Sequence, residues 1–165
     1  MSHDTAGTPE PSDLDCLIVG GGPAGLTAAT YLARFRRHVL LVDDGHSRAR
    51  LIPETQNYPG FVGISGVDLL AQLREQALRN GAVLREARVE ELRKVGEVFV
   101  ARAGNGEIRA KRLLLATGIV DESPDLPGLK DAIYRGALRF CPICDGFEAR
   151  DKRIGVLGPL RIATG

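Results

Sequence analysis

Gly20-Gly-Gly-Pro-Ala-Gly25 is preceded by the apolar run Leu14-Asp-Cys-Leu-Ile-Val19 and followed by small and apolar residues at helical spacing up to residue 35. This succession predicts a strand, a tight turn and a helix. Residues 39–42 form a second apolar strand. The three elements therefore make a βαβ unit, in which the two strands are parallel and the crossover is right-handed.

The spacing of Gly20, Gly22 and Gly25 is typical of a turn that binds a dinucleotide. The first glycine permits the tight turn, the second lets the backbone approach a pyrophosphate, and the third lets the helix pack closely on the strand. Asp43 ends the second strand, 23 positions after Gly20, where it would bind the hydroxyls of an adenosine ribose. The turn alone does not distinguish FAD from NAD, and a glycine-rich turn without a ligand is the plainer alternative.

A helix and an antiparallel layer are predicted next along the chain. Ser65-Gly-Val-Asp68 has the spacing of a capping box before an apolar helical pattern, and Asn80-Gly81 is a helix stop. From Val83 the pattern alternates, and strands are predicted at residues 89–95, 98–103 and 107–115. Asn105-Gly106 predicts a hairpin between the last two strands. The continuous apolar end of the third strand predicts that it returns to the core sheet.

The chain is expected to divide into three parts. Residues 1–13 are polar, lack the pattern of a secretory signal and are expected to be a disordered leader of a cytoplasmic protein. Residues 14–120 form the nucleotide-binding domain. Residues 121–165 contain a linker with prolines and a glycine and then an incomplete second domain, in which residues 154–157 resemble the first strand of another nucleotide-binding unit. The expected fold class is α/β.

The overall composition is that of a globular protein, with 44% apolar and 26% charged residues. A formal net charge of +1 gives no electrostatic basis for binding nucleic acid or an anionic surface. No apolar run approaches the roughly 20 residues that a membrane-spanning helix requires. Neither nucleic acid nor a membrane is therefore an expected partner.

Cys141-Pro-Ile-Cys144 is the second motif with chemical meaning. In a chain without an export signal, two cysteines at this spacing favour a redox or metal pair over a structural disulfide. Such a pair cycles between dithiol and disulfide, and Asp145 could exchange a proton with a thiolate. Zinc lacks further ligands, because Cys16 lies within a strand and the three histidines are scattered. Two buried apolar cysteines are the remaining alternative, and Cys16 is expected to be a core residue.

Four short motifs occur in order along the chain. They are Gly20-Gly-Gly-Pro-Ala-Gly25, Asn57-Tyr-Pro-Gly60, Ala116-Thr-Gly118 and Cys141-Pro-Ile-Cys-Asp-Gly146. In sequence and separation, the four resemble the low-molecular-weight thioredoxin reductases from about Leu14 to the chain end. The resemblance implies a Rossmann-like FAD-binding domain, made of a parallel sheet with a small antiparallel β-layer. The truncated start of a second nucleotide-binding domain would follow it.

The resemblance also implies the roles of the site residues. FAD would be bound by Gly20, Gly22, Pro23, Ala24, Gly25, Asp43, Asn57, Thr117 and Gly118. Cys144 would face the isoalloxazine ring, Cys141 would attack the external disulfide, and Asp145 would donate the proton. The implied protein is an FAD-dependent disulfide oxidoreductase, a homodimer at full length. Electrons would pass from a nicotinamide such as NADPH to FAD, to the cysteine pair and to a thioredoxin-like protein or a small-molecule disulfide.

The chain departs from these reductases in three respects. Residues 45–56 include His46, Arg48 and Arg50 where thioredoxin reductases have an uncharged, glycine-rich loop, which argues against thioredoxin as substrate. Leu160 stands where a glycine would admit the pyrophosphate of NADPH. Two nucleotide domains need a chain roughly twice as long. A flavin-dependent dithiol oxidase for small molecules and a non-catalytic FAD-binding redox sensor are therefore the alternative functions.

Overall fold

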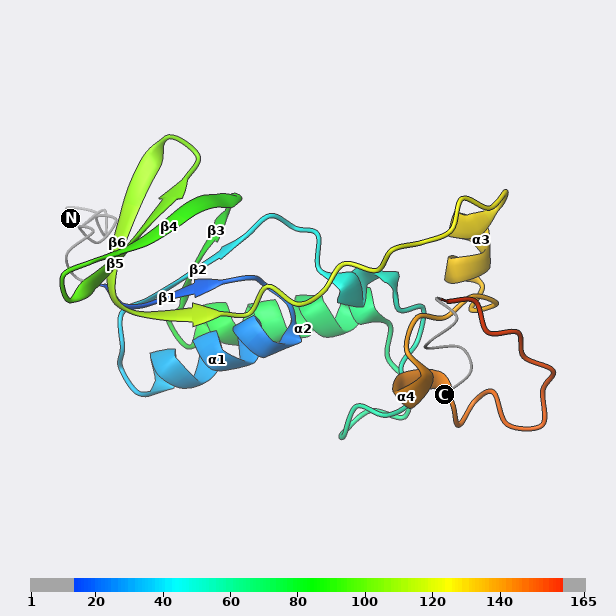
Figure 1. Cartoon of the computed structure of the whole chain (residues 1–165). Coiled ribbons are helices and arrows are strands. Elements are labelled where there is room, and N and C mark those ends of the chain that lie inside the picture. Colours follow the sequence, from blue (N-terminus) through cyan, green and yellow to red (C-terminus); the bar gives the residue numbers. More distant parts are fainter. Residues whose placement is uncertain (1–13, 159–165) are drawn as a thin grey trace, which may run out of the picture.

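The computed structural model describes residues 14–158, and Figure 1 shows their elements. The expected leader and the turn at Leu160 lie outside the described residues. The strands are β1 (Leu14–Val19), β2 (Val39–Asp43), β3 (Val83–Glu86), β4 (Val89–Val95), β5 (Val98–Ala103) and β6 (Gly106–Leu115). The helices are α1 (Pro23–Arg34), the 3-10 helix η2 (Arg48–Leu51), α2 (Gly66–Arg79), α3 (Leu129–Tyr134) and α4 (Pro142–Asp145).

All six strands form one mixed sheet in the order β3-β2-β1-β6-β5-β4. β1 pairs in parallel with β2 on one side and with β6 on the other. The predicted βαβ unit and the return of β6 to the core sheet are therefore confirmed. The sequence pattern assigns no strand to β3, because its four residues include Arg85 and Glu86. Pairing with β2, rather than local propensity, makes it a strand.

The antiparallel layer consists of β4, β5 and the first half of β6. The predicted hairpin between β5 and β6 is present, but its loop lies one residue earlier than expected. Ala103 faces Gly106, so the two loop residues are Gly104 and Asn105. Gly104 has a φ of 60°, and a glycine at the first loop position is what a type II′ hairpin turn requires.

Both faces of the parallel strands are covered. Figure 1 shows α1 and α2 lying along one face of the sheet. The core on that side includes Ile18, Leu26, Leu41 and Leu69. A second cluster on the opposite side contains Leu14, Leu17, Leu40, Val42, Ala101, Ala103, Ile108 and Ala110. Burial on both faces explains why β1 and β2 are continuous apolar runs rather than alternating ones.

The start and stop of α2 agree with the sequence pattern. The Ser65 side chain accepts a hydrogen bond from the backbone N–H of Asp68 at 3.0 Å and donates one to Oδ2 of Asp68 at 2.6 Å. The helix ends at Arg79, Asn80 is its C-cap, and Gly81 follows with a φ of 94°. These groups replace the hydrogen-bond partners that a helix lacks at its ends. The predicted N-cap at Ser65 and the stop are confirmed, but the Asp68 carboxylate accepts from the Ser65 hydroxyl rather than from the Ser65 backbone N–H that a full capping box uses.

The chain beyond β6 differs from the rest. Figure 1 shows α3 and α4 on a segment that extends away from the sheet. The predicted strand at residues 154–157 is wrong, because these residues have no regular structure. Ile154, Val156 and Leu157 are about 70% exposed, and an apolar run without a neighbouring strand has no hydrogen-bond ladder to join. No helix in residues 14–158 is long and apolar enough to span a membrane.

Candidate functional site

The turn between β1 and α1 is held by two very close backbone contacts. Gly20 has a φ of 109°, and a Cβ placed there would lie 2.3 Å from the carbonyl oxygen of Ala116. A Cβ at Gly25 would lie 1.9 Å from the carbonyl oxygen of Gly20. Neither position can therefore hold a side chain without movement of the backbone. The tight turn and close helix–strand packing expected of Gly20 and Gly25 both have this geometric basis.

The start of α1 is open at Gly22. A Cβ at this residue would meet only the Ser47 Oγ, at the ordinary contact distance of 3.4 Å. Gly22 is the N-cap of α1, Pro23 occupies the first turn, and no side chain caps the helix. The first turn also contains no acidic residue. Backbone N–H groups at an uncapped helix start, together with the helix dipole, form a binding site for phosphate.

Asp43 lies next to the turn at the end of β2. Its Oδ1 accepts a hydrogen bond from the Gly21 N–H at 2.8 Å, and its Oδ2 accepts one from the Gly45 N–H at 3.1 Å. A carboxylate has about four acceptor positions, so two are left for hydroxyl groups of a ligand. The structure thus brings Asp43 and the glycine turn together, and Asp43 also fixes the backbone of that turn.

The remaining residues expected around the cofactor lie on two loops. Thr117 is adjacent to the turn, since its Cα would be 3.2 Å from a Cβ at Gly20, and Gly118 follows with a φ of 67°. Asn57 lies on the loop after η2, where its Oδ1 accepts a hydrogen bond from the Thr55 hydroxyl at 2.7 Å. Thr117 is therefore at the turn and Gly118 follows it in the chain, whereas Asn57 has only a local hydrogen bond.

Arg48 and Asp121 join these two loops. The Arg48 guanidinium forms an ion pair with the Asp121 carboxylate, and the two side chains are 25% and 15% exposed. Arg48 is one of the charged residues that depart from the thioredoxin reductase pattern. The structure gives it a place in the fold, as a partly buried link between η2 and the segment that leads to α3.

Cys141 and Cys144 form a disulfide bond, with their Cα atoms 5.2 Å apart. Cys141 is the N-cap of α4, and its Sγ accepts a hydrogen bond from the Cys144 N–H at 3.1 Å. Both cysteines are only partly buried. Asp145 ends α4, and its carboxylate lies 3.4 Å from the guanidinium of Arg139. The pair is thus an accessible disulfide at the start of a short helix, beside a carboxylate held by an arginine.

The third cysteine, Cys16, lies in the core and is not part of the disulfide. Cys16 is a free, buried thiol, and burial raises its pKa. A thiol with a raised pKa is a poor nucleophile, which fits the expected core role. Within residues 14–158, no three His, Cys, Asp or Glu side chains are gathered so as to hold a metal ion.

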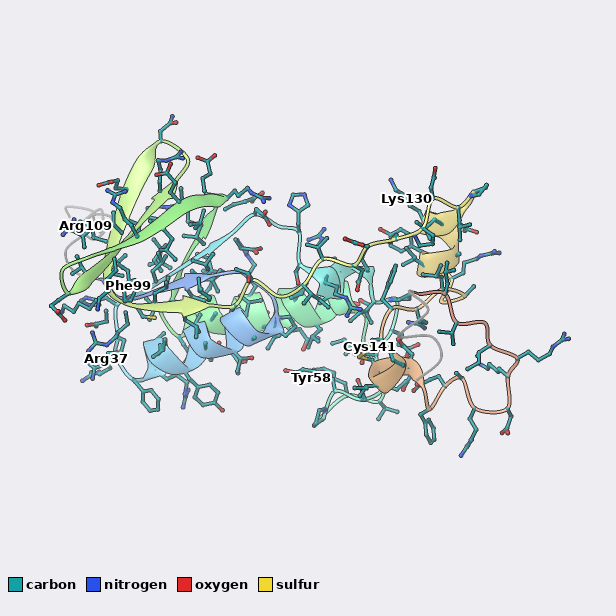
Figure 2. All side chains as sticks on the ribbon, in the orientation of Figure 1. Arg37, Tyr58, Phe99, Arg109, Lys130 and Cys141 are labelled. Atoms are coloured by element: carbon teal, nitrogen blue, oxygen red, sulfur yellow. A yellow bond between two sulfur atoms is a disulfide. The ribbon has the colours of Figure 1, made fainter. Side chains whose placement is uncertain are left out.

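The glycine turn and the disulfide are on separate parts of the described chain. Figure 2 shows Cys141 at α4, on the segment that extends beyond the sheet. No hydrogen bond or ion pair between described residues connects α4 with the glycine turn. Each motif is therefore held by its own hydrogen bonds, and none of the hydrogen bonds or ion pairs among residues 14–158 joins the nine expected cofactor-binding residues to Cys141, Cys144 or Asp145.

Two further residues shape the turn without being among the cofactor-binding residues expected from sequence. Gly21 donates to Asp43, and a Cβ at Gly21 would lie 2.6 Å from the Asp43 Cγ. Ala116 supplies the carbonyl that restricts Gly20. The dinucleotide motif requires glycine at positions 20 and 22 of this run but not at position 21. The only sequence signal for a special role of Gly21 was therefore that it makes the run three glycines long. The role of Ala116 depends on the pairing of β6 with β1 in particular, whereas the apolar pattern of β6 predicts only a return to the core sheet.

Comparison with known proteins gives consistent results. A family model described as pyridine nucleotide-disulphide oxidoreductase matches residues 14–159. A probable thioredoxin reductase of Arthroderma benhamiae is 35% identical over 155 residues, which cover 89% of this chain and 38% of that protein. A thioredoxin reductase of Mycolicibacterium smegmatis is 38% identical over 147 residues, covering 87% of this chain and 47% of that protein.

Two solved structures have the same fold as this chain over most of its length. The crystal structure of HlmI has a TM-score of 0.78 and 33% identity, covering 88% of this chain and 47% of that one. Thioredoxin reductase from Streptococcus pyogenes has a TM-score of 0.76 and 30% identity, covering 81% of this chain and 44% of that one. The chain spans less than half the length of each of these four proteins. The expected Rossmann-like fold with an antiparallel layer is confirmed, and the chain belongs to the pyridine nucleotide-disulphide oxidoreductase family, within which it is thioredoxin reductase-like.

Proposed function

We propose that this chain carries the FAD-binding turn and the redox disulfide of a flavin-dependent disulfide oxidoreductase. The observation that supports the proposal most strongly is the presence of both parts in one chain of this family. One part is the uncapped start of α1 behind a glycine turn, and the other is the Cys141–Cys144 bond at the start of α4. Either part alone has a structural explanation, whereas both together are what electron transfer through a flavin to a disulfide requires.

The glycine turn offers backbone N–H groups for the pyrophosphate of FAD and the Asp43 carboxylate for its ribose. Backbone N–H groups of the first turn of α1, after Gly22 and Pro23, would donate to the pyrophosphate, because no side chain competes for them. The small side chain of Ala24 leaves the same approach open. Asp43 would accept hydrogen bonds from the ribose hydroxyls through positions that Gly21 and Gly45 leave free.

The other cofactor contacts are proposed from the loops around the turn. Thr117 and Gly118 would line the crevice beside Gly20, to which Thr117 is already close. Asn57 would contact the flavin end of the cofactor from the loop after η2. When bound, FAD supplies a two-electron carrier that accepts electrons from a nicotinamide or passes them to a disulfide.

The cysteine pair would carry the electrons to substrate by thiol–disulfide exchange. In the reduced pair, the Cys141 thiolate attacks one sulfur of an external disulfide and forms a mixed disulfide. The Cys144 thiolate then attacks Cys141, which restores the Cys141–Cys144 bond and releases the substrate as a dithiol. Asp145, held by Arg139, would deliver the proton that the leaving thiolate takes up. Two electrons thus pass from the pair to the substrate.

For the substrate and for the electron donor, we propose two alternatives each. The two reductases named above suggest a thioredoxin-like protein, and the charged loop with Arg48 and Arg50 favours a small-molecule disulfide or dithiol instead. NADPH is the donor that the family suggests, and Leu160 argues against its usual mode of binding. That residue favours the alternative of a dithiol oxidase that needs no nicotinamide. We further propose a cytoplasmic homodimer for the full-length protein.

The test starts with the purified full-length protein. We expect a yellow protein with a flavin spectrum, which is bleached on adding a dithiol or NADPH anaerobically and restored by a disulfide. A matched Cys144→Ser variant is expected to keep the flavin but lose disulfide turnover. Oxygen consumption with a dithiol and no nicotinamide would favour the oxidase, and bound flavin without turnover would favour a sensor. A colourless protein that does not take up added FAD would refute the proposal.

A further inference from the structure

The Ser47 hydroxyl lies beside the open side of the glycine turn. Among residues 14–158, and apart from the two chain neighbours of Gly22, only the Ser47 Oγ lies within 4 Å of a Cβ placed on Gly22, at 3.4 Å. The missing Cβ of this second glycine is what lets a pyrophosphate approach the backbone. The Ser47 hydroxyl is therefore at the edge of the space that a pyrophosphate would enter.

This hydroxyl is not used by the protein groups around it. Ser47 precedes η2 as its N-cap residue, but its side chain accepts no hydrogen bond from that helix. Its Oγ has no other hydrogen-bond partner in the described part of the chain, although the residue is partly buried. A partly buried hydroxyl usually has a partner, and as an O–H donor it is available to an anionic ligand.

The backbone donors next to it, at the start of α1, are available in the same way. The first hydrogen bond of the helix runs from the Leu26 N–H to the Gly22 carbonyl, at 3.0 Å. Within the described residues, the N–H groups of Ala24 and Gly25 donate to no carbonyl or side chain. A phosphate group is bound by several donors that converge on it. Ser47 adds to these N–H groups a donor from a different loop.

The backbone around Ser47 is held in place by protein contacts. η2 packs directly on the start of α2, where a Cβ at Gly66 would lie 1.7 Å from the Ala49 carbonyl oxygen. The ion pair of Arg48 with Asp121 also attaches η2 to the connection after β6. These contacts hold the loop independently of a ligand. Little conformational freedom is therefore lost when the hydroxyl forms a hydrogen bond with one.

We propose that Ser47 is a further cofactor-binding residue, whose hydroxyl donates a hydrogen bond to a pyrophosphate oxygen of FAD. It acts together with the N–H groups at the start of α1. Ser47 lies in the segment 45–56, where thioredoxin reductases have a glycine-rich loop. Part of this departure therefore serves the cofactor rather than the substrate. The inference rests on the binding of FAD in the proposed function, but not on the cysteine pair.

The experiment measures the affinity of the full-length protein for FAD. The flavin is removed, FAD is titrated back, and the change in flavin fluorescence gives the dissociation constant. Ser47→Ala is expected to raise this constant about tenfold, the effect of losing one hydrogen bond to a charged group. Ser47→Thr keeps the hydroxyl and should restore most of the affinity. Ser123→Ala is the matched control, because Ser123 is an exposed serine in the connection after β6, and it should leave the affinity unchanged.

Phosphorus NMR of the bound FAD tests whether the contact is made to the pyrophosphate. Ser47→Ala should move at least one of the phosphorus resonances, and Ser123→Ala should move none. Resonances that stay in place in Ser47→Ala would overturn the inference, whatever the affinity, because the hydroxyl would then not touch the phosphates. A full-length protein that binds no FAD would overturn the proposed function together with this inference, so the two failures are distinguishable.

Discussion

The glycines of the turn after β1 are required for different reasons, which substitutions can separate. A methyl group at Gly25 would lie 1.9 Å from the Gly20 carbonyl oxygen, and that oxygen belongs to the backbone at the end of β1. Gly25→Ala is therefore expected to destabilise the fold by about 1–3 kcal/mol, the range for overpacking. Urea unfolding followed by circular dichroism measures the loss. Stability equal to that of the unchanged chain would contradict the close packing of α1 on β1.

Gly22→Ala tests cofactor binding without this structural cost. The added methyl would be 3.4 Å from the Ser47 Oγ, and Gly22 has a φ of −73°, which alanine adopts readily. The free energy of unfolding should change by less than about 0.5 kcal/mol. FAD affinity, measured by flavin fluorescence titration of the full-length protein, should fall at least tenfold because the methyl occupies the pyrophosphate position. Unchanged affinity would place the cofactor elsewhere.

Asp15 gives stability a dependence on acid pH. Its carboxylate accepts a hydrogen bond from the His38 N–H at 3.0 Å, and this bond, aided by Lys111, lowers the pKa of Asp15. A lowered pKa means that Asp15 stabilises the fold above the ordinary value of about 4, and that this contribution is lost as pH falls through the folded value. Asp15→Asn should therefore lower stability at pH 6 and reduce its fall between pH 6 and pH 3. Urea midpoints across this range measure both effects, and parallel curves for the two proteins would be the contrary result.

At the scale of elements, the N-cap of α2 contributes a measurable part of the stability. Ser65 accepts from the Asp68 N–H, and α2 buries Leu69, Leu73 and Ala77 against the sheet and α1. Ser65→Ala should cost about 1 kcal/mol, since one N–H at the helix start loses its partner. Ser65→Thr retains a hydroxyl and is the control, with a smaller loss. Equal losses in both variants would show that packing, rather than capping, is responsible.

The elements that could be predicted from sequence are those whose signals are local. The glycine turn, the Ser65 cap and the apolar runs of β1 and β2 each follow from neighbouring residues, and all are confirmed. β3 could not be predicted because its pairing with β2 comes from the fold. Residues 154–157 carry a strand pattern but have no partner strand, so the pattern misleads. For the site, Asp43 at the turn was predictable from the βαβ geometry, whereas the contact of the Ala116 carbonyl with Gly20 was not.

At the scale of the whole molecule, the sheet domain and the segment with α3 and α4 are joined through a long connection after β6. Residues 116–128 contain no regular structure, and Ile119 and Val120 are exposed. Asp121 lies within this connection and is paired with Arg48 of η2. The ion pair therefore attaches the connection to the same side of the molecule as the loop that follows β2, and it restricts where the disulfide segment can move.

The last prediction concerns this attachment. Arg48→Gln and Asp121→Asn should each speed cleavage by subtilisin within residues 116–128, and the double variant should be cleaved no faster than either single variant. In a double-mutant cycle on the free energy of unfolding, measured by urea denaturation, Arg48 and Asp121 should show a coupling energy of about 1–2 kcal/mol. This value lies between those of an exposed and a buried ion pair, because both side chains are mostly buried. The exposed pair of Arg102 and Glu91 on β5 and β4 is the control, with a coupling below about 1 kcal/mol. Additive effects of the Arg48 and Asp121 changes would show that the connection is held by other contacts, and the disulfide segment would then move independently of η2.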